Sequence, residues 1–217
     1  MNTDWIIGQT IQHVKSELRE SEGGHDWWHI YRVWSMARHI AQTESVDQLV
    51  VELGALLHDI ADSKFHGGDE EIGPHQARAF MESLGLEALT VQHVENIVRY
   101  ISFKGGREIA AFKSPELAVV QDADRLDAIG AIGIARAFNY GGYRGRALYD
   151  PDIPPDLNMD KEAYKKSQAP TINHFYEKLL RLKERMNTRR GRELAEERHR
   201  FMEQYLERFY REWEGQW

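Results

Sequence analysis

The sequence has 217 residues, with 28 Lys and Arg against 35 Asp and Glu and a formal net charge of −7 at pH 7. This acidic balance lacks the basic footprint of a nucleic-acid-coating protein, so no stable nucleic-acid partner is expected. The absence of cysteine excludes disulfides, thiolate zinc sites and cysteine nucleophiles, so imidazole and carboxylate groups must hold any metal. The N-terminal segment carries charges and no long apolar run, which predicts neither a secretory signal nor a membrane anchor and, by default, a cytoplasmic location.

Apolar residues recur at helical spacing along most of the chain, while the alternating patterns of strands are scarce, which predicts an all-α fold. The first stripes predict a helix that ends at 23–24, a second over 26–43 and a third over about 46–62. Pro74 and Gly85 fit the first turn and the C-terminal stop of the next helix, and another apolar stripe follows it.

The second half of the sequence begins with a helix predicted over about 115–138, followed by a segment rich in Gly, Pro, Tyr and Arg over 139–160. Such a segment is more often functional than idle, although a mobile excursion explains it equally well. Two further helices are predicted near 170–187 and 189–213, and the last has alternating Glu and Arg around its apolar stripe, which suits packing or homodimer formation. We read 1–217 as one domain.

The adjacent pair His58-Asp59 lies near the C-terminal end of an otherwise apolar helix, ELGALLHDIAD. Adjacent polar residues are costly to bury without partners, and a divalent metal would satisfy both. Because neighbouring residues on a helix point about 100° apart, further ligands must come from other helices. His29 and Asp124 are the candidates, since each lies on a helix with an apolar stripe and has an arginine soon after it that suits an anionic substrate.

Two imidazoles and two carboxylates form a mixed nitrogen and oxygen ligand set, which suits Mn²⁺, Fe²⁺, Co²⁺, Ni²⁺ or Zn²⁺ and leaves positions for water and phosphate oxygens. Such an ion lowers the pKa of its bound water and polarises a phosphoryl group. The residues alone favour a metal site only slightly. A hydrogen-bonded helix end explains the pair nearly as well, and His25-Asp26 is a second pair of this kind.

Three spaced motifs, taken together, resemble those of the HD-domain phosphohydrolase superfamily: H-x-x-R-V from His29, HD at His58-Asp59 and A-D-R-L around Asp124. The resemblance covers roughly residues 20–130 and implies an HD-domain helical bundle, here with additional C-terminal helices. It implies that the metal ligands are His29, His58, Asp59 and Asp124.

The same resemblance separates these ligands from two decoys. It maps the family's last aspartate onto Asp124, whereas Asp122 would point away on the helix. His25-Asp26 does not match, because it lacks the R-V that follows the first ligand.

Most of the chain also resembles a bacterial subgroup of this superfamily, the YpgQ/YedJ-like proteins, in segments such as DADRLDAIGAIGIARAF and YGGYRGRALYD. That resemblance implies a nucleotide pyrophosphohydrolase that releases diphosphate from nucleoside or deoxynucleoside triphosphates, with Mn²⁺ favoured over Mg²⁺ and the other divalent ions. Release of a single phosphate from the triphosphate is also compatible with it. A 5′-nucleotidase or a phosphodiesterase on the same scaffold is an alternative, as is a non-catalytic module that binds nucleotides and signals.

Two-metal HD proteins carry two further histidines, one ahead of a Gly-Pro pair and one ahead of a Thr or Ser on a later helix. Those positions hold Ile72 and Ile101 here. Isoleucine cannot coordinate a cation, so a single metal ion is predicted. His75 and His93 are fallback ligands, for which a surface or capping role is the simpler interpretation.

Asp62 lies three residues after Asp59, hence on nearly the same helical face, and matches the acidic catalytic residue of mononuclear HD nucleotidases. We assign general acid/base chemistry or water orientation to Asp62, beside the ligand Asp59. A solvent-facing carboxylate at a helix end is the alternative role for Asp62.

Cationic and aromatic side chains suit the phosphates and the base of a nucleotide. The residues assigned to substrate binding are Arg32, Lys64, Lys104, Arg125, Tyr140, Arg144, Arg146 and Lys178. Structural ion pairs are the alternative for the two arginines nearest the ligands. Core packing rather than a nucleobase cage is expected for most of Trp27, Trp28, Trp34 and Trp213.

Overall fold

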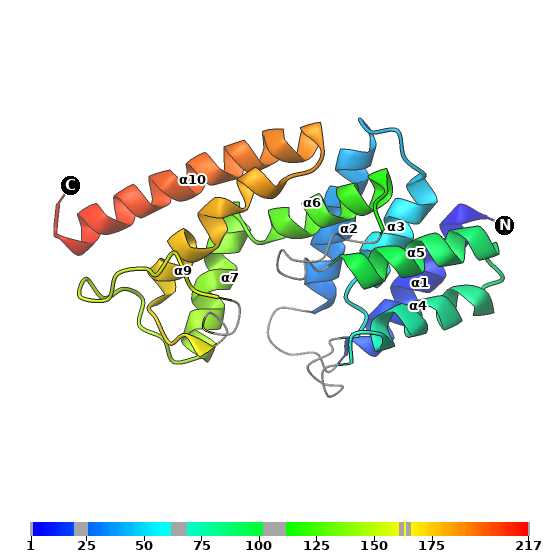
Figure 1. Cartoon of the computed structure of the whole chain (residues 1–217), viewed down its shortest axis with the longest axis horizontal. Coiled ribbons are helices and arrows are strands. Elements are labelled where there is room, and N and C mark those ends of the chain that lie inside the picture. The colour runs from blue at the N-terminus through cyan, green and yellow to red at the C-terminus, as the bar shows by residue number, and fades with distance from the viewer. Residues whose placement is uncertain are drawn as a thin grey trace. The chain divides into compact units, whose positions relative to one another are not determined.

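The computed structural model describes residues 2–19, 26–61, 69–101, 112–160, 163 and 166–216, which contain helices and no strand. The expected all-α fold is therefore confirmed (Figure 1). The backbone contacts form two compact units, one up to Asp124 and one from Arg125 onward. None of the described helices is long and apolar enough to cross a membrane.

The N-terminal unit is built around a short central helix, α3, which packs against α1, α2 and α5, while α4 packs along α5 (Figure 1). Its helices are α1 (Thr3–Glu17), α2 (Trp27–Ala41), α3 (Gln48–Leu57), α4 (Ile72–Ser83), α5 (Ala88–Tyr100) and the first part of α6 (Pro115–Asp127). Nearly every residue of α3 from Val50 to Leu57 is buried, because neighbours cover it on several sides. Burial on all sides explains why α3 reads as an almost continuous apolar run.

Side-chain caps place the starts of two of these helices. The Asp26 carboxylate accepts a hydrogen bond from the backbone N–H of His29, and the Asp47 carboxylate accepts one from that of Val50. These bonds satisfy N–H groups that have no partner within a helix. The His25-Asp26 decoy thus includes a helix cap. At the far end of α4, Gly85 adopts a φ of 74°, as predicted for a glycine stop.

The C-terminal unit packs α7 against α9 and α10. Its elements are α7 (Gly130–Tyr143), α9 (Thr171–Glu177), the 3-10 turns η2 (Leu179–Arg181) and η3 (Lys183–Arg185), and α10 (Arg189–Trp213). Aromatic rings fill the space between the helices, with Phe138 and Phe175 at 5.9 Å and Phe175 and Tyr205 at 6.1 Å between centroids. The helix predicted over 189–213 matches α10.

Two predicted helices are interrupted. The helix expected over 115–138 ends at Asp127, and a new one begins at Gly130, whose φ of 75° is not helical and whose Cβ, if present, would lie 2.9 Å from Arg198 Cγ. The helix expected over 170–187 ends at Glu177 and continues as 3-10 turns, which place the buried Leu179 and Leu182 on one side. The irregular segment expected from 139 starts later, because α7 continues to Tyr143.

Candidate metal centre

Two buried histidines from different helices meet in the N-terminal unit. His29 lies in the first turn of α2, where the Asp26 cap fixes its backbone, and its exposed fraction is 3%. His58 follows the last residue of α3 as its C-terminal cap, and its exposed fraction is 8%. Their ring centroids are 5.3 Å apart, with the ring planes at 68°.

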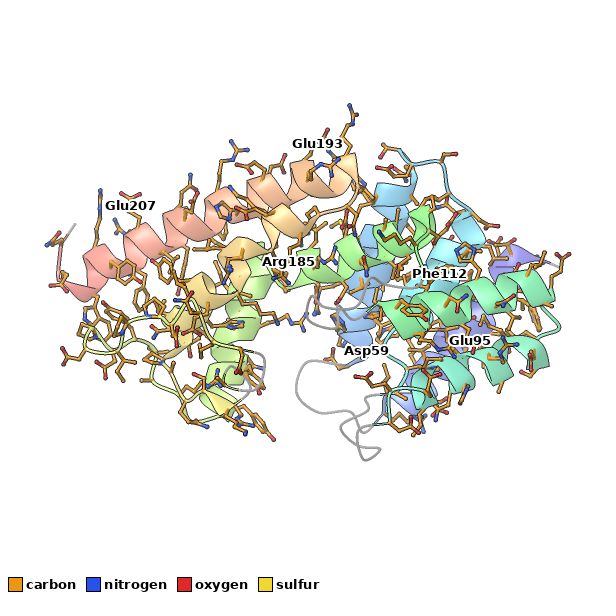
Figure 2. All side chains as sticks on the ribbon, in the orientation of Figure 1. Asp59, Glu95, Phe112, Arg185, Glu193 and Glu207 are labelled. Carbon is orange, nitrogen blue, oxygen red and sulfur yellow. The ribbon has the colours of Figure 1, made fainter. Side chains whose placement is uncertain are left out.

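Two carboxylates adjoin the imidazoles. One possible ligand atom from each of His29, His58 and Asp59 lies within 4.8 Å of the other two (Figure 2 labels Asp59). From α6, Asp124 Oδ1 lies 3.6 Å from His29 Nε2 and 3.9 Å from His58 Nε2. These separations are too long for hydrogen bonds. They suit ligand atoms around a common ion, because two atoms each about 2.1 Å from one cation lie about 3 to 4 Å apart.

The hydrogen bonding of His58 leaves its ring nitrogen Nε2 available to a metal ion. Nδ1 lies 2.8 Å from the carbonyl oxygen of Ala55, so Nδ1 carries the proton and donates, and Nε2 presents its lone pair. That Nε2 is buried and has no hydrogen-bond partner. A buried polar atom without a partner costs about 1–3 kcal/mol. A divalent cation bound at Nε2 removes this cost, and the donor set of imidazole and carboxylate groups fits such an ion.

The site is unevenly exposed. Both imidazoles are buried, whereas the side chain of Asp124 has an exposed fraction of 41%. Asp122, two residues earlier on α6, is fully buried. Solvent therefore reaches this group of side chains at the Asp124 carboxylate.

Several residues predicted for catalysis or substrate binding cannot be placed. Asp62, Lys64 and Lys104 lie outside the described residues. Helix α3 ends at Leu57, so the argument that Asp62 shares a helical face with Asp59 is wrong in its premise. The assignment of Asp62 now depends on the family resemblance alone.

The predicted cations that are described have separate surroundings. Arg32 lies on α2, one turn after His29, and is partly exposed. Arg125 donates a hydrogen bond to the backbone carbonyl of Arg185 at 2.7 Å within the C-terminal unit. That contact favours a structural role for Arg125 over a substrate contact.

In the C-terminal unit Arg146 and Tyr140 come together. The Arg146 guanidinium lies 5.7 Å from the centroid of the Tyr140 ring and donates a hydrogen bond to the carbonyl of Ser167 at 2.6 Å. Arg144 and Lys178 are exposed. The sequence placed all four among the substrate contacts, and the structure brings Arg146 against Tyr140.

His174 was missed as a distinctive residue. Burial, together with the charges of Lys178 and Arg146, lowers the pKa of His174 from 6.5 to about 4. The sequence expected a partly exposed helical position, which the structure confirms, and no local pattern signals that this imidazole lies near two cations.

The remaining histidines and tryptophans have structural or surface roles. His75 is exposed, with its Nε2 4.0 Å from a Glu71 oxygen, and His93 Nε2 lies 2.9 Å from the Ser114 hydroxyl, so neither joins the candidate metal ligands. Trp28 is 61% exposed, and Trp213 is also exposed, so these two are not part of the core. The Trp28 ring lies 6.0 Å from that of Tyr31, and the Trp213 ring lies 5.1 Å from that of Tyr149.

Comparison with known proteins places this geometry in a family. The HD domain family model matches residues 27–129, a range that includes all of the predicted metal ligands. The Bacillus subtilis protein YpgQ is 39% identical over 196 residues, which is 89% of this chain and 86% of YpgQ. This chain belongs to the HD domain family.

Solved structures agree with membership of the HD family. An HD-superfamily hydrolase from Bacillus thuringiensis is 42% identical, with a TM-score of 0.80 over 99% of this chain and all of that one. The crystal structure of Bacillus subtilis YpgQ in complex with ADP is 36% identical, with a TM-score of 0.76 over 98% of this chain and 97% of YpgQ. The expected HD recognition and the HD-type helical fold are confirmed. HD domains bind divalent metals, and the His29–His58–Asp59 cluster lies within the matched range.

Proposed function

We propose that this HD protein hydrolyses a phosphoanhydride bond of nucleoside or deoxynucleoside triphosphates, using one divalent cation, with Mn²⁺ the favoured ion. The observation that carries the proposal is the buried Nε2 of His58, which has no hydrogen-bond partner and lies beside His29 and Asp124. The ADP complex of the relative YpgQ supports a nucleotide as the ligand class.

We assign the ion to His29, His58, Asp59 and Asp124. A bound divalent ion at this site would supply Lewis-acid polarisation of a phosphoryl oxygen and a lowered pKa for water. The buried imidazoles offer nitrogen donors, and the Ala55 carbonyl holds the His58 tautomer that such a role requires. Ile72 and the buried Ile101 occupy the two positions where two-metal HD proteins carry further histidines, so one ion per chain is proposed.

The reaction proposed adds a water oxygen to the α-phosphorus and breaks the bond from that phosphorus to the bridging oxygen, giving a nucleoside monophosphate and diphosphate. Asp62 is the proposed general acid/base, which takes the proton of the attacking water. Arg32 lies three residues after the ligand His29 on α2, is partly exposed and is proposed to contact phosphate. The pairing of Arg146 with Tyr140 offers a flat cationic and aromatic surface that suits a nucleobase.

The alternatives share the metal ligands and differ in product. A 5′-nucleotidase releases phosphate from a monophosphate, and a phosphodiesterase opens a diester. A binding module that signals would hold nucleotide without turnover. Because the solvent-open carboxylate of Asp124 suits access by a substrate oxygen, we favour hydrolysis over binding alone.

The test is a nucleotide panel assayed with Mn²⁺, Mg²⁺, Co²⁺ and Zn²⁺, with every product identified. Asp59→Ala should lose both bound metal and activity, whereas Asp62→Ala should keep the metal and lose turnover. Glu87→Ala is the matched control, since Glu87 is an exposed carboxylate of the same unit that makes no capping hydrogen bond. Full metal occupancy and wild-type rates in Asp59→Ala would contradict the site.

The number of ions is tested separately by elemental analysis of the protein after gel filtration. One tightly bound ion per chain is expected. Two tightly bound ions would contradict the argument from Ile72 and Ile101. A triphosphate that yields phosphate instead of diphosphate would move the cleaved bond to the terminal phosphoryl group.

A further inference from the structure

Helix α6 carries the candidate ligand Asp124, so the rotation of this helix about its own axis decides whether the carboxylate reaches the imidazoles. Side-chain atoms lie about 5–6 Å from a helix axis, so a rotation of about 20° would move the carboxylate by about 2 Å. A ligand displaced that far leaves the bonding distance of a divalent ion. The buried apolar face of α6, which includes Val120 and Ala123, limits this rotation, and a polar contact close to Asp124 fixes it further.

Gln121 makes such a contact. Its side-chain amide Nε2 lies 3.2 Å from the carbonyl oxygen of Tyr100 and 3.4 Å from that of Ile101, and donates to them. These carbonyls lie at the C-terminal end of α5, where backbone acceptors have no partner within the helix. The amide of Gln121 thus joins α6 to the end of α5.

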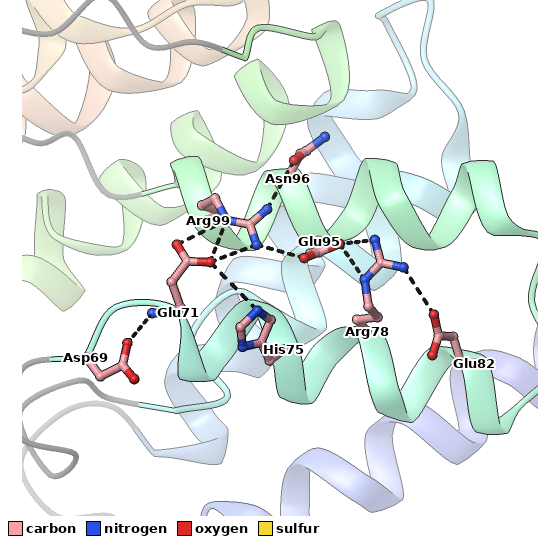
Figure 3. Close-up of polar contacts among 8 residues, drawn as sticks. All are labelled: Asp69, Glu71, His75, Arg78, Glu82, Glu95, Asn96 and Arg99. Carbon is pink, nitrogen blue, oxygen red and sulfur yellow. Dashed lines mark hydrogen bonds and ion pairs between the residues drawn. The ribbon is translucent and has the colours of Figure 1, made fainter.

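The end of α5 is itself held in place. Arg99 donates through Nε to both oxygens of Glu71, at 3.1 and 3.0 Å, and through Nη2 to Glu95 at 2.7 Å. Its Nη1 donates to Asn96 at 3.3 Å. Glu71 immediately precedes α4, so this network ties the last turn of α5 to α4 (Figure 3). Gln121 therefore joins α6 to carbonyls at a helix end that the Arg99 network holds in place.

The spacing between Gln121 and Asp124 transmits this attachment. Residues three apart on a helix lie about 60° apart around the axis and about 4.5 Å apart along it. Two further polar contacts of α6 lie at its N-terminal end, where Ser114 accepts from the N–H of Leu117 at 3.0 Å and Glu116 accepts from that of Asp47 at 3.0 Å. Those contacts lie more than one turn further from Asp124 than Gln121 does.

We propose that Gln121 is a positioning residue for the metal centre, which sets the rotation of α6 and so brings the Asp124 carboxylate to His29 and His58. This inference rests on the proposed metal site. It assigns Gln121 no contact with substrate.

The test uses the full-length protein and Mn²⁺ alone, titrated while free Mn²⁺ is followed by electron paramagnetic resonance. Gln121→Met removes the donor at nearly constant volume and is expected to weaken Mn²⁺ binding about 10-fold. Gln121→Glu replaces the donor by an acceptor that faces two carbonyls, and is expected to weaken binding at least as much. A negative charge near a cation should by itself strengthen binding, so the two explanations predict opposite signs for this variant.

Ser114→Ala is the matched control, because it removes the capping hydrogen bond at the other end of the same helix. Its Mn²⁺ affinity should stay within about 2-fold of the wild type. Helical content and urea unfolding, both measured with a chelator present, identify any variant that fails to fold. If Gln121→Glu fails to fold, Gln121→Met alone decides the test. Unchanged affinity in Gln121→Met, tighter binding in Gln121→Glu, or equal losses in Gln121→Met and Ser114→Ala would overturn the proposal. If the wild type binds no Mn²⁺, the proposed metal site itself fails.

Discussion

Stability should depend on pH through His174, the enclosed imidazole of the C-terminal unit. Burial is the largest cause of its lowered pKa, and the charges of Lys178 and Arg146 add to it. In the unfolded chain the imidazole titrates near 6.5, so between about pH 4 and 6.5 the unfolded state binds more protons than the folded state. The stability contributed by the neutral imidazole is therefore complete above pH 6.5 and is lost as the pH falls toward 4.

The magnitude follows from the size of the shift. A pKa lowered from 6.5 to about 4 corresponds to about 3 kcal/mol at 1.36 kcal/mol per pKa unit. We therefore expect the free energy of unfolding to fall by about 2–3 kcal/mol more in the wild type than in His174→Gln between pH 7 and pH 4.

The measurement is urea unfolding of metal-free wild type and His174→Gln at half-unit intervals from pH 4 to 7.5. The difference between the two proteins removes the contribution of every other titrating group that the substitution leaves unchanged. Lys178→Met removes one of the repelling charges and should give a slope between the two. Parallel pH profiles for wild type and His174→Gln would refute the reasoning.

Three further outcomes are expected. Gly54→Val should destabilise the protein by about 1–3 kcal/mol in urea unfolding, because a Cβ there would lie 3.0 Å from an α5 side chain. Gly8→Ala, where a Cβ would meet nothing within 4 Å, should be neutral or stabilising. Equal effects of the two substitutions would contradict this expectation. Arg99→Met should cost about 2–3 kcal/mol, since the buried Glu95 would lose one of its two arginines; a loss below about 0.5 kcal/mol, again by urea unfolding, would contradict it. Mn²⁺ at 100 times its dissociation constant should stabilise the wild type by about 2.7 kcal/mol and the His58→Ala variant by almost nothing. The stabilisation is measured as the rise in the midpoint of thermal unfolding. Equal rises in the two proteins would exclude His58 from the site.

Helix positions were largely predictable from the sequence, because apolar spacing and caps act locally. The apolar stripes of α2 and α10 predicted the extents of these helices to within a few residues. Gly85, whose φ is positive, marks the end of α4 as predicted. The two interruptions were not predictable. A Cβ at Gly130 would lie 2.9 Å from Arg198 Cγ, far along the chain, and the 3-10 turns after Glu177 include the buried Leu179, so both breaks accompany tertiary packing that local patterns do not encode.

The candidate site divides in the same way. The types and order of the ligand side chains were visible as motifs, so His29, His58, Asp59 and Asp124 were nominated together. The carbonyl of Ala55 that sets the His58 tautomer carries no side-chain signature, and neither does the contact of a glutamine amide with the end of another helix. Backbone acceptors are the same in every residue, so sequence patterns do not distinguish them.

The contrast between buried imidazoles and a half-open carboxylate has a kinetic consequence for metal exchange. An ion held at the group would be released stepwise, and water or a chelator would reach the partly exposed carboxylates of Asp124 and Asp59 before the buried imidazoles. Competing oxygen ligands would therefore assist dissociation at the carboxylates, and the bonds to the imidazole nitrogens would break last. Exchange should accelerate with the concentration of a small carboxylate chelator, and bulky chelators should strip the ion more slowly than small ones of equal affinity.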